Sequence, residues 1–360
     1  MKNTVNLNSV NLVNDDSLSY IKTLPDNCID LIATDPPYFQ VKSCSWDNQW
    51  ENVTSYLLWL DEMLAEFWRV LKPNGSLYMF CGSKLAADTE LLLRERFNVL
   101  NHIIWAKPSG PWRRACKADL RSFFPSTERI LFAEHYQSPY KGKSSDYLQQ
   151  CKQLKENVLK PLIEYFKQSR ESLGITAKEI QQATGKQMAS HWFSYSQWQL
   201  PNESDYQKLQ ELFRRVASEK HSENPLNRSH SDLAEAQVTL SREYRELAEQ
   251  YQLLRRPFSV TVDVPYTDVW TYPPVQYYPG KHPCEKPAVM MEHIINSSSR
   301  EGDVVADFFM GSGATIKAAL KLNRRVIGVE LETERFQQTK LDIAEDKLLN
   351  NLCCGQNLAQ

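Results

Sequence analysis

The chain has 360 residues, of which 42% are hydrophobic and 24% charged, an ordinary composition for a soluble globular protein of two or three domains. Its formal net charge of −2 gives no overall basic signature, so any contact with nucleic acid has to come from one local surface. Eight irregularly spaced cysteines without a C-x-x-C pair, a polar N-terminus and short apolar runs predict free thiols in a reducing cytoplasm, with no zinc site, secretion signal or membrane span.

Predicted strands and helices alternate in the first part of the chain. Residues 10–13 predict a strand, 17–24 a helix capped by Ser17, and the apolar run 29–34 a buried strand. The same order continues with a helix over 54–71, a stop at Lys72-Pro73-Asn74-Gly75, a strand over 76–80, a helix over about 84–96 and a strand over 99–106. This alternation predicts a parallel sheet that binds ligands at the carboxyl ends of its strands, where Asp16 and Asp35 both lie.

A basic stretch interrupts the pattern at residues 107–121. Against a single acid, Asp119, it carries the cationic residues Lys107, Arg113, Arg114, Lys117 and Arg121. A solvated loop is the ordinary explanation of such a run. Because the stretch follows a strand that ends at the ligand edge, we predict instead that it contacts phosphates.

Residues from about 145 to 256 have a helical pattern without a clear strand. Residues 176–179 form a capping-box signal, and Gly185 ends the helix that they begin. A second short helix to residue 193 would complete a helix-turn-helix, although an ordinary helical hairpin suits the sequence equally well. Leucines at every seventh position from Leu233 to Leu254 would suit a dimer arm, but so short a repeat favours packing on a neighbouring helix.

The alternating pattern resumes after an irregular segment, residues 265–287, that is rich in proline and tyrosine. It comprises a helix over about 288–298, a strand over 303–307, a glycine-containing loop, a helix over 314–322 and a strand over 325–330. We therefore predict an α/β fold: a doubly wound, mostly parallel sheet of the Rossmann type, built from both ends of the chain, with a large helical insertion.

The loop Gly311-Ser312-Gly313 lies between a predicted strand and helix, where glycine lets the backbone approach a ligand closely. Glu330 ends the next strand, and a carboxylate there can accept both hydroxyls of a ribose. Position 316 is Ile316, so the phosphate-binding G-x-G-x-x-G pattern is incomplete. The loop predicts a ligand with an adenosine but no pyrophosphate, which S-adenosylmethionine fits; a tight structural turn is the alternative.

The stretch Asp35-Pro36-Pro37-Tyr38 follows the buried strand. The exocyclic amine of a nucleobase is a poor nucleophile because its lone pair is delocalised into the ring. The Asp35 carboxylate and the Pro36 carbonyl could accept its two hydrogens and localise that pair, while Tyr38 stacks on the base. A base in a duplex has to flip out to reach such a pocket. A polar turn after a strand is the alternative.

Three segments together resemble the β class of DNA amino-methyltransferases. Asp35-Pro36-Pro37-Tyr38 matches their D-P-P-Y motif, residues 307–313 are similar to their D-x-F-x-G-x-G donor loop, and residues 282–287 to the H-P-x-x-K-P segment before it. Catalytic motif first, recognition region next and donor motif last is the order of this class. The resemblance covers roughly residues 8–108 and 265–345.

The resemblance implies a methyltransferase that uses S-adenosylmethionine as methyl donor and modifies a flipped base of a specific duplex site, as in restriction–modification. The target base would be held by Asp35, Pro36, Pro37 and Tyr38. The donor would be held by Asp16, Asp35, Lys286, Asp307, Phe308, Phe309, Gly311, Gly313 and Glu330. Aspartate at position 35 favours N6 of adenine over N4 of cytosine.

The resemblance also implies a domain order. The expected parts are a first catalytic part at 1–108, a target-recognition region at 109–264 with the helix-turn-helix candidate near 175–193, a second, donor-binding part at 265–350 and a tail at 351–360. The expected setting is the cytoplasm of a bacterium, with a bacterial or phage-encoded protein on nucleoid DNA, as a monomer or homodimer and without a metal.

Other functions suit parts of the same sequence. A DNA-binding regulator with a decayed catalytic core would use the inserted helices alone, and RNA or a protein amide would suit the same acceptor geometry. The dipeptide Pro283-Cys284 resembles the nucleophile of cytosine-C5 methyltransferases. Because it lies within the H-P-x-x-K-P segment, we interpret Cys284 as incidental and His282 as structural support.

Overall fold

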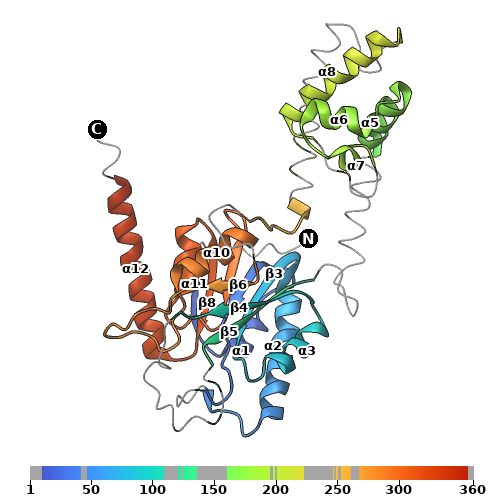
Figure 1. Ribbon diagram of the computed structural model, residues 1–360. Helices are drawn as coiled ribbons and strands as arrows, with labels where there is room; N and C mark the ends of the chain where they lie inside the picture. Colours follow the sequence, from blue (N-terminus) through green and yellow to red (C-terminus); the bar gives the residue numbers. More distant parts are fainter. Residues whose placement is uncertain are drawn as a thin grey trace. The chain divides into compact units, whose positions relative to one another are not determined.

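The computed structural model describes residues 10–41, 47–108, 121, 123, 125–135, 160–194, 198, 201–222, 246, 249, 253–260 and 267–355 (Figure 1). The chain divides into two compact units, Met1–Lys143 together with Arg256–Gln360, and Ser144–Arg255. The first unit holds a sheet built from both ends of the chain, and the second is helical. Among the described residues, no helix has the length and apolarity that crossing a bilayer requires.

One eight-stranded sheet, in the order β1-β8-β7-β2-β3-β5-β4-β6, forms the centre of the first unit. Its strands are β1 Val10–Asn14, β2 Ile29–Thr34, β3 Leu71–Cys81, β4 Asn98–Ala106, β5 Thr127–Glu134, β6 Val269–Thr271, β7 Val304–Asp307 and β8 Arg325–Glu330. β5 is antiparallel to β3 and β4, and the other neighbours are parallel. The predicted mostly parallel sheet is confirmed.

Helices cover both faces of this sheet. They are α1 Ser17–Ile21, α2 Val53–Val70, α3 Ala86–Arg94, α10 Ala288–Ser298, α11 Ala314–Lys321 and α12 Thr333–Gly355. Strand β2 shows the two layers because its side chains alternate between them. Ile32 packs in one apolar cluster with Leu60 of α2, whereas Leu31 packs in a second cluster with Met290 of α10. The double winding expected from the alternating sequence is therefore present.

Strand β5 corrects the predicted first boundary at residue 108. Its central residues Ile130, Leu131 and Ala133 are fully buried, and it pairs along its whole length with β3 or β4. The sheet therefore extends to Glu134, within the region that the sequence had given to target recognition. The strand is antiparallel to both of its neighbours, so the parallel strand–helix alternation that located the other strands gave no signal for it.

A smaller correction concerns Lys72–Gly75, expected as a stop before a strand. Helix α2 does end at Val70, but β3 already begins at Leu71. Its register against β2 jumps from Ile29↔Leu71 to Leu31↔Ser76, so the four residues form an irregularity within the strand. Gly75 fits there because a Cβ would lie 2.9 Å from the Asp30 carbonyl oxygen.

The second unit contains α5 Lys160–Leu173, α6 Ala177–Thr184, α7 Ala189–Trp192 and α8 Glu203–Glu219. The predicted capping box is confirmed, since Thr176 accepts from the Glu179 N–H and Glu179 accepts from the Thr176 N–H. Gly185 ends α6 with a φ of 74°, in the left-handed region. Helix α7 has only four residues and is shorter than predicted. Leu233, Leu240 and Leu247 lie outside the described residues, so the dimer arm stays a prediction.

Candidate functional site

A pocket of about 520 Å³ lies in the first unit, within the size range of ligand sites. Residues at the carboxyl ends of six strands line it: Asp16 after β1, Asp35 after β2, Gly82 after β3, Lys107 after β4, Phe308 after β7 and Glu330 at the end of β8. Parallel strands place these ends on one edge of the sheet, as the sequence predicted.

Most of the predicted site residues meet in this pocket. Its walls include Asp16, Asp35, Pro36, Pro37, Tyr38, Lys107, Lys286, Phe308, Phe309, Gly311 and Glu330. Asp307 and Gly313 are not among its lining residues. Of the predicted phosphate contacts, Arg121 is exposed and is not among the lining residues, whereas Arg113, Arg114 and Lys117 lie outside the described residues.

Asp35 leaves the sheet at the end of β2, a strand in which every residue is buried. Its Oδ1 accepts a hydrogen bond from the Tyr38 hydroxyl at 2.5 Å, and its Oδ2 forms an ion pair with the Lys286 ammonium. Burial raises the pKa of Asp35, and Lys286 opposes that rise. The carboxylate that the sequence assigned to the target amine is therefore held between two protein donors.

Asp47, which is almost fully buried, holds the turn after Asp35 in place. Its carboxylate accepts from the Tyr38 N–H at 2.9 Å and from the Val41 N–H at 2.6 Å. The Tyr56 hydroxyl donates to the Pro37 carbonyl at 2.9 Å. Together with the fixed φ of proline, these bonds give the wall of the pocket one conformation.

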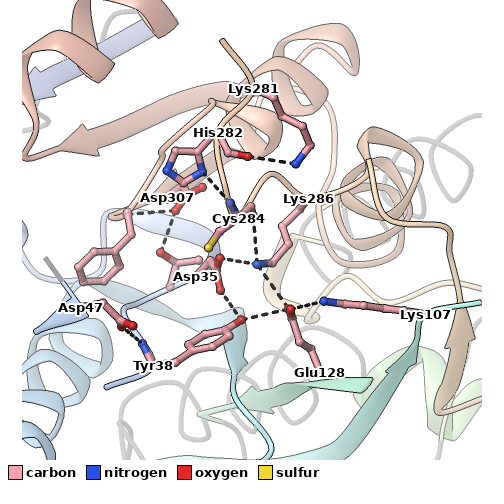
Figure 2. A network of polar contacts seen from close by, with 12 residues as sticks. Asp35, Tyr38, Asp47, Lys107, Glu128, Lys281, His282, Cys284, Lys286 and Asp307 are labelled. Carbon is pink, nitrogen blue, oxygen red and sulfur yellow. Dashed lines mark hydrogen bonds and ion pairs between the residues drawn. The ribbon is translucent and has the colours of Figure 1, made fainter. Parts of the chain in front are cut away.

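Glu128, the second residue of β5, is a pocket residue that the sequence reading missed. Figure 2 shows its carboxylate opposite Asp35, with Tyr38 and Lys286 between the two acids and Lys107 on its other side. Glu128 Oε2 lies 3.5 Å from Lys286 Nζ and 3.3 Å from the Tyr38 hydroxyl. An acid two positions before the apolar run 130–133 was the signal that could have revealed it.

The charges of this cluster shift one another. Burial raises the pKa of Glu128, but the ammonium groups of Lys286 and Lys107 outweigh it and bring the pKa below its ordinary value. Burial likewise lowers the pKa of Lys286, but Asp35 and Glu128 outweigh it and raise the pKa. The two acids therefore favour the charged form of Lys286, and Lys107 forms an ion pair with Glu128 at the pocket.

The other wall of the pocket is the loop between β7 and α11. The Gly311 N–H donates to Glu330 Oε2 at 2.9 Å, and the Glu332 N–H donates to Glu330 Oε1 at 2.9 Å. Burial raises the pKa of Glu330. Both carboxylate oxygens are thereby oriented at the strand end, and their remaining lone pairs can accept hydroxyl hydrogens.

The loop needs its two glycines for different reasons. Gly311 has a φ of 49°, and a Cβ there would lie 3.1 Å from the His282 ring. Gly313 has a φ of 73°, and a Cβ there would lie 2.6 Å from Thr339 Cγ2. Gly311 thus borders the pocket, whereas Gly313 allows α12 to pack closely behind the loop.

Asp307 lies behind the pocket wall and organises it. Its Oδ1 accepts from the Thr34 hydroxyl at 2.8 Å and from the Phe309 N–H at 3.1 Å. Burial raises its pKa to about 6. This bonding joins the ends of β2 and β7 and shapes the loop, and a contact of Asp307 with the donor stays a prediction.

Asp16 borders the pocket as the N-cap of α1, a role that the sequence reading gave to Ser17. Its carboxylate accepts from the Ser19 N–H at 2.9 Å, while the Ser17 hydroxyl donates to the Phe308 carbonyl.

The donor set suits an adenosine-containing methyl donor. Glu330 presents an oriented carboxylate for a ribose, and Gly311 brings backbone to the pocket surface. Phe309 and Trp59, in edge contact with ring centroids 5.8 Å apart, supply aromatic lining. Ile316 stands where the phosphate-binding pattern has its third glycine, and its side chain is fully buried in the core. The loop therefore lacks the third glycine of a phosphate-binding loop.

Comparisons with known proteins point to one group. A family model for N6/N4 methyltransferases, described as DNA methylase, matches residues 29–341. The DNA adenine methyltransferase YhdJ of Escherichia coli (strain K12) is 23% identical over 339 residues, 92% of this chain and 83% of that protein. The type II methyltransferase M2.DpnII of Streptococcus pneumoniae is 25% identical over 353 residues, 91% of this chain and 87% of that protein.

A solved structure shares the fold. The PvuII DNA methyltransferase, titled cytosine-N4-specific, aligns with a TM-score of 0.51 at 12% identity, covering 94% of this chain and 93% of that one. At this identity the likeness concerns the arrangement of strands and helices alone.

Proposed function

This chain belongs to the DNA methylase family, and on that premise we propose that it methylates N6 of adenine, flipped out of a specific duplex DNA site, with S-adenosylmethionine as donor. One observation carries the proposal: Asp35-Pro36-Pro37-Tyr38 and the Gly311–Glu330 pair line the same pocket, although they lie at opposite ends of the chain. A base amine and a methyl donor bound on these two walls would meet.

The acceptor side would activate the amine by hydrogen bonding. The Asp35 carboxylate and the Pro36 carbonyl are the two candidate acceptors, because the neighbouring Pro37 carbonyl already accepts from Tyr56. In a buried pocket such bonds are stronger than in water. With both hydrogens held, the nitrogen lone pair is localised and aimed away from the ring, which is the state that can attack.

The donor carries its methyl group on a sulfonium, which makes that group electrophilic. When the amine nitrogen bonds to the methyl carbon, the carbon–sulfur bond breaks and the nitrogen becomes positively charged. The nitrogen then loses one hydrogen as a proton. Asp35, bonded to one of the amine hydrogens, is placed to accept it.

Adenine is favoured over cytosine by two facts. Position 35 is aspartate, and a relative similar over most of its length bears the printed name of a DNA adenine methyltransferase. Duplex DNA incubated with the protein and donor, then digested to nucleosides, tests the choice by mass spectrometry. N6-methyladenine is expected; N4-methylcytosine would contradict the adenine assignment, and neither product would contradict methylation of DNA.

We also propose that the helical unit contributes to reading the site. Its α6, the turn at Gly185 and α7 keep the order of a helix-turn-helix, with Ile180 and Trp192 buried beneath. The turn and the start of α7 expose the polar side chains Gln187 and Ser190. Amide and hydroxyl groups of this kind bind base edges in the major groove. The alternative of a binding protein with a decayed core is disfavoured by the intact pocket.

A further inference from the structure

Both oxygens of the Asp35 carboxylate are occupied in the structure. The Tyr38 hydroxyl binds Oδ1 at 2.5 Å, and the Lys286 ammonium binds Oδ2. Under the proposed function, one of these oxygens has to accept a hydrogen from the target amine. Each oxygen keeps a second lone pair, but both contacts draw electron density from the carboxylate, so transferring either one to another acceptor would make Asp35 a stronger acceptor for the amine.

Releasing Lys286 without a second partner would be costly. Its side chain is 8% exposed, and a buried ammonium that loses its carboxylate is left as an uncompensated charge. Glu128 removes this obstacle, because its Oε2 already lies 3.5 Å from Lys286 Nζ. The same oxygen lies 3.3 Å from the Tyr38 hydroxyl. Both groups that hold Asp35 thus share one alternative acceptor.

Glu128 is itself anchored independently of Asp35. Its Oε1 accepts from the Lys107 ammonium, which lies 4.5 Å from the centre of the Trp105 ring. In the sheet, Glu128 pairs in register with Trp105. Two carboxylates and two ammonium groups make the cluster neutral, so Lys286 can move from one acid to the other without a change in net charge.

We propose that Glu128 is a positioning residue that takes over Lys286 and the Tyr38 hydroxyl when the target amine enters, and so makes Asp35 a stronger acceptor for an amine hydrogen. The inference rests on the proposed function and extends it to a residue outside the three sequence motifs. Glu128 does not touch the reacting atoms; it sets how strongly Asp35 accepts.

The first test is Glu128→Gln in the full-length protein, which keeps the shape of the side chain and removes its charge. We expect the methylation kcat to fall about 100-fold, with the donor KM and the melting temperature nearly unchanged. Glu134→Gln is the matched control: Glu134 lies on the same strand, is also buried and pairs with Arg256 outside the pocket. Equal kcat values for Glu128→Gln and wild type would overturn the inference.

A double-mutant cycle with Lys286→Met separates this role from a structural one. Without Lys286 there is no ammonium to move and only the Tyr38 hydroxyl is left to transfer, so Glu128→Gln in that background should lower kcat much less than it does with Lys286 present. Equal losses in both backgrounds would overturn the exchange. A second double variant, Glu128→Gln with Lys107→Met, makes the cluster neutral again. Its kcat should stay as low as that of Glu128→Gln alone. A kcat restored to the wild-type value would overturn the inference, because only the net charge of the cluster would then matter.

The outcomes remain distinct from those of the proposed function. A wild-type protein that leaves DNA unmethylated contradicts both the function and the exchange. A wild-type protein that methylates DNA, with Glu128→Gln equally fast, contradicts the exchange alone.

Discussion

Lys286 forms an ion pair with Asp35 across 251 positions of sequence. The two residues belong to segments that the sequence analysis recognised separately, the H-P-x-x-K-P segment and the D-P-P-Y motif. Their contact places the acceptor motif and the segment before the donor loop in one pocket. It also shows that Lys286, predicted to serve the donor, is bound to the acceptor carboxylate.

Glu330 is expected to determine donor affinity. Replacing it by glutamine removes a charged acceptor that two backbone N–H groups orient. Hydrogen bonds to charged groups contribute about 1.5–3 kcal/mol, so the donor Kd should rise roughly 10- to 100-fold. Isothermal titration with S-adenosylmethionine measures it. Unchanged affinity would contradict the ribose role, and Glu332→Gln serves as the control because only its backbone N–H holds Glu330.

Gly313→Ala is expected to destabilise the fold. The backbone there has a φ of 73°, and the added methyl would meet Thr339 at 2.6 Å. The combined backbone and steric effect should lower the free energy of unfolding by about 1–3 kcal/mol. Urea denaturation measures the change. Gly280→Ala is the comparison: its φ is 80°, but nothing lies within 4 Å of its Cβ, so a smaller loss is expected.

Asp307 should make stability depend on pH. Its pKa in the folded protein is raised to about 6, above the unfolded value near 3.8, so the folded state binds the proton more tightly. Its contribution to stability is present below about pH 4 and is lost as pH rises to about 6, by at most about 3 kcal/mol. Asp307→Asn should remove this dependence.

Urea unfolding of wild type and Asp307→Asn at several pH values checks the prediction. Between about pH 4 and pH 6 the unfolding free energy of wild type should fall relative to that of the variant. Above about pH 6 the difference between the two proteins should stay constant. Parallel curves across this range would show that the carboxyl group is not perturbed in the fold.

The helical unit should affect site recognition without affecting the donor. Replacing Gln187 and Ser190 together by alanine removes two polar side chains exposed at the turn and at α7. A good contact to a base edge favours the correct base over a wrong one by about 1–3 kcal/mol. The affinity for duplex DNA that carries the target site should therefore fall about 10- to 100-fold. Fluorescence anisotropy with specific and scrambled duplexes measures it. A variant as specific as wild type would place recognition elsewhere.

The alternation of strands and helices in the sequence was enough to predict the parallel part of the sheet and the edge at which the pocket lies. The apolar run before Asp35 and the glycine loop before Glu330 gave the sheet edge, the pocket and its two walls. The sequence did not reveal β5, because an antiparallel strand breaks the parallel strand–helix alternation, and Glu128 remained hidden with it. Nor could the sequence show that Asp307 accepts a hydrogen bond from Thr34, because the two residues lie on strands that are far apart in the sequence.

The most direct measurement compares wild type with Asp35→Ala, using duplex DNA and donor labelled with deuterium in the methyl group. Nucleoside mass spectrometry should find labelled N6-methyladenine with wild type. With Asp35→Ala the rate should fall at least about 100-fold, because the amine loses its charged acceptor, while anisotropy shows DNA binding within about threefold of wild type. Equal labelling by both proteins would contradict the central role of Asp35.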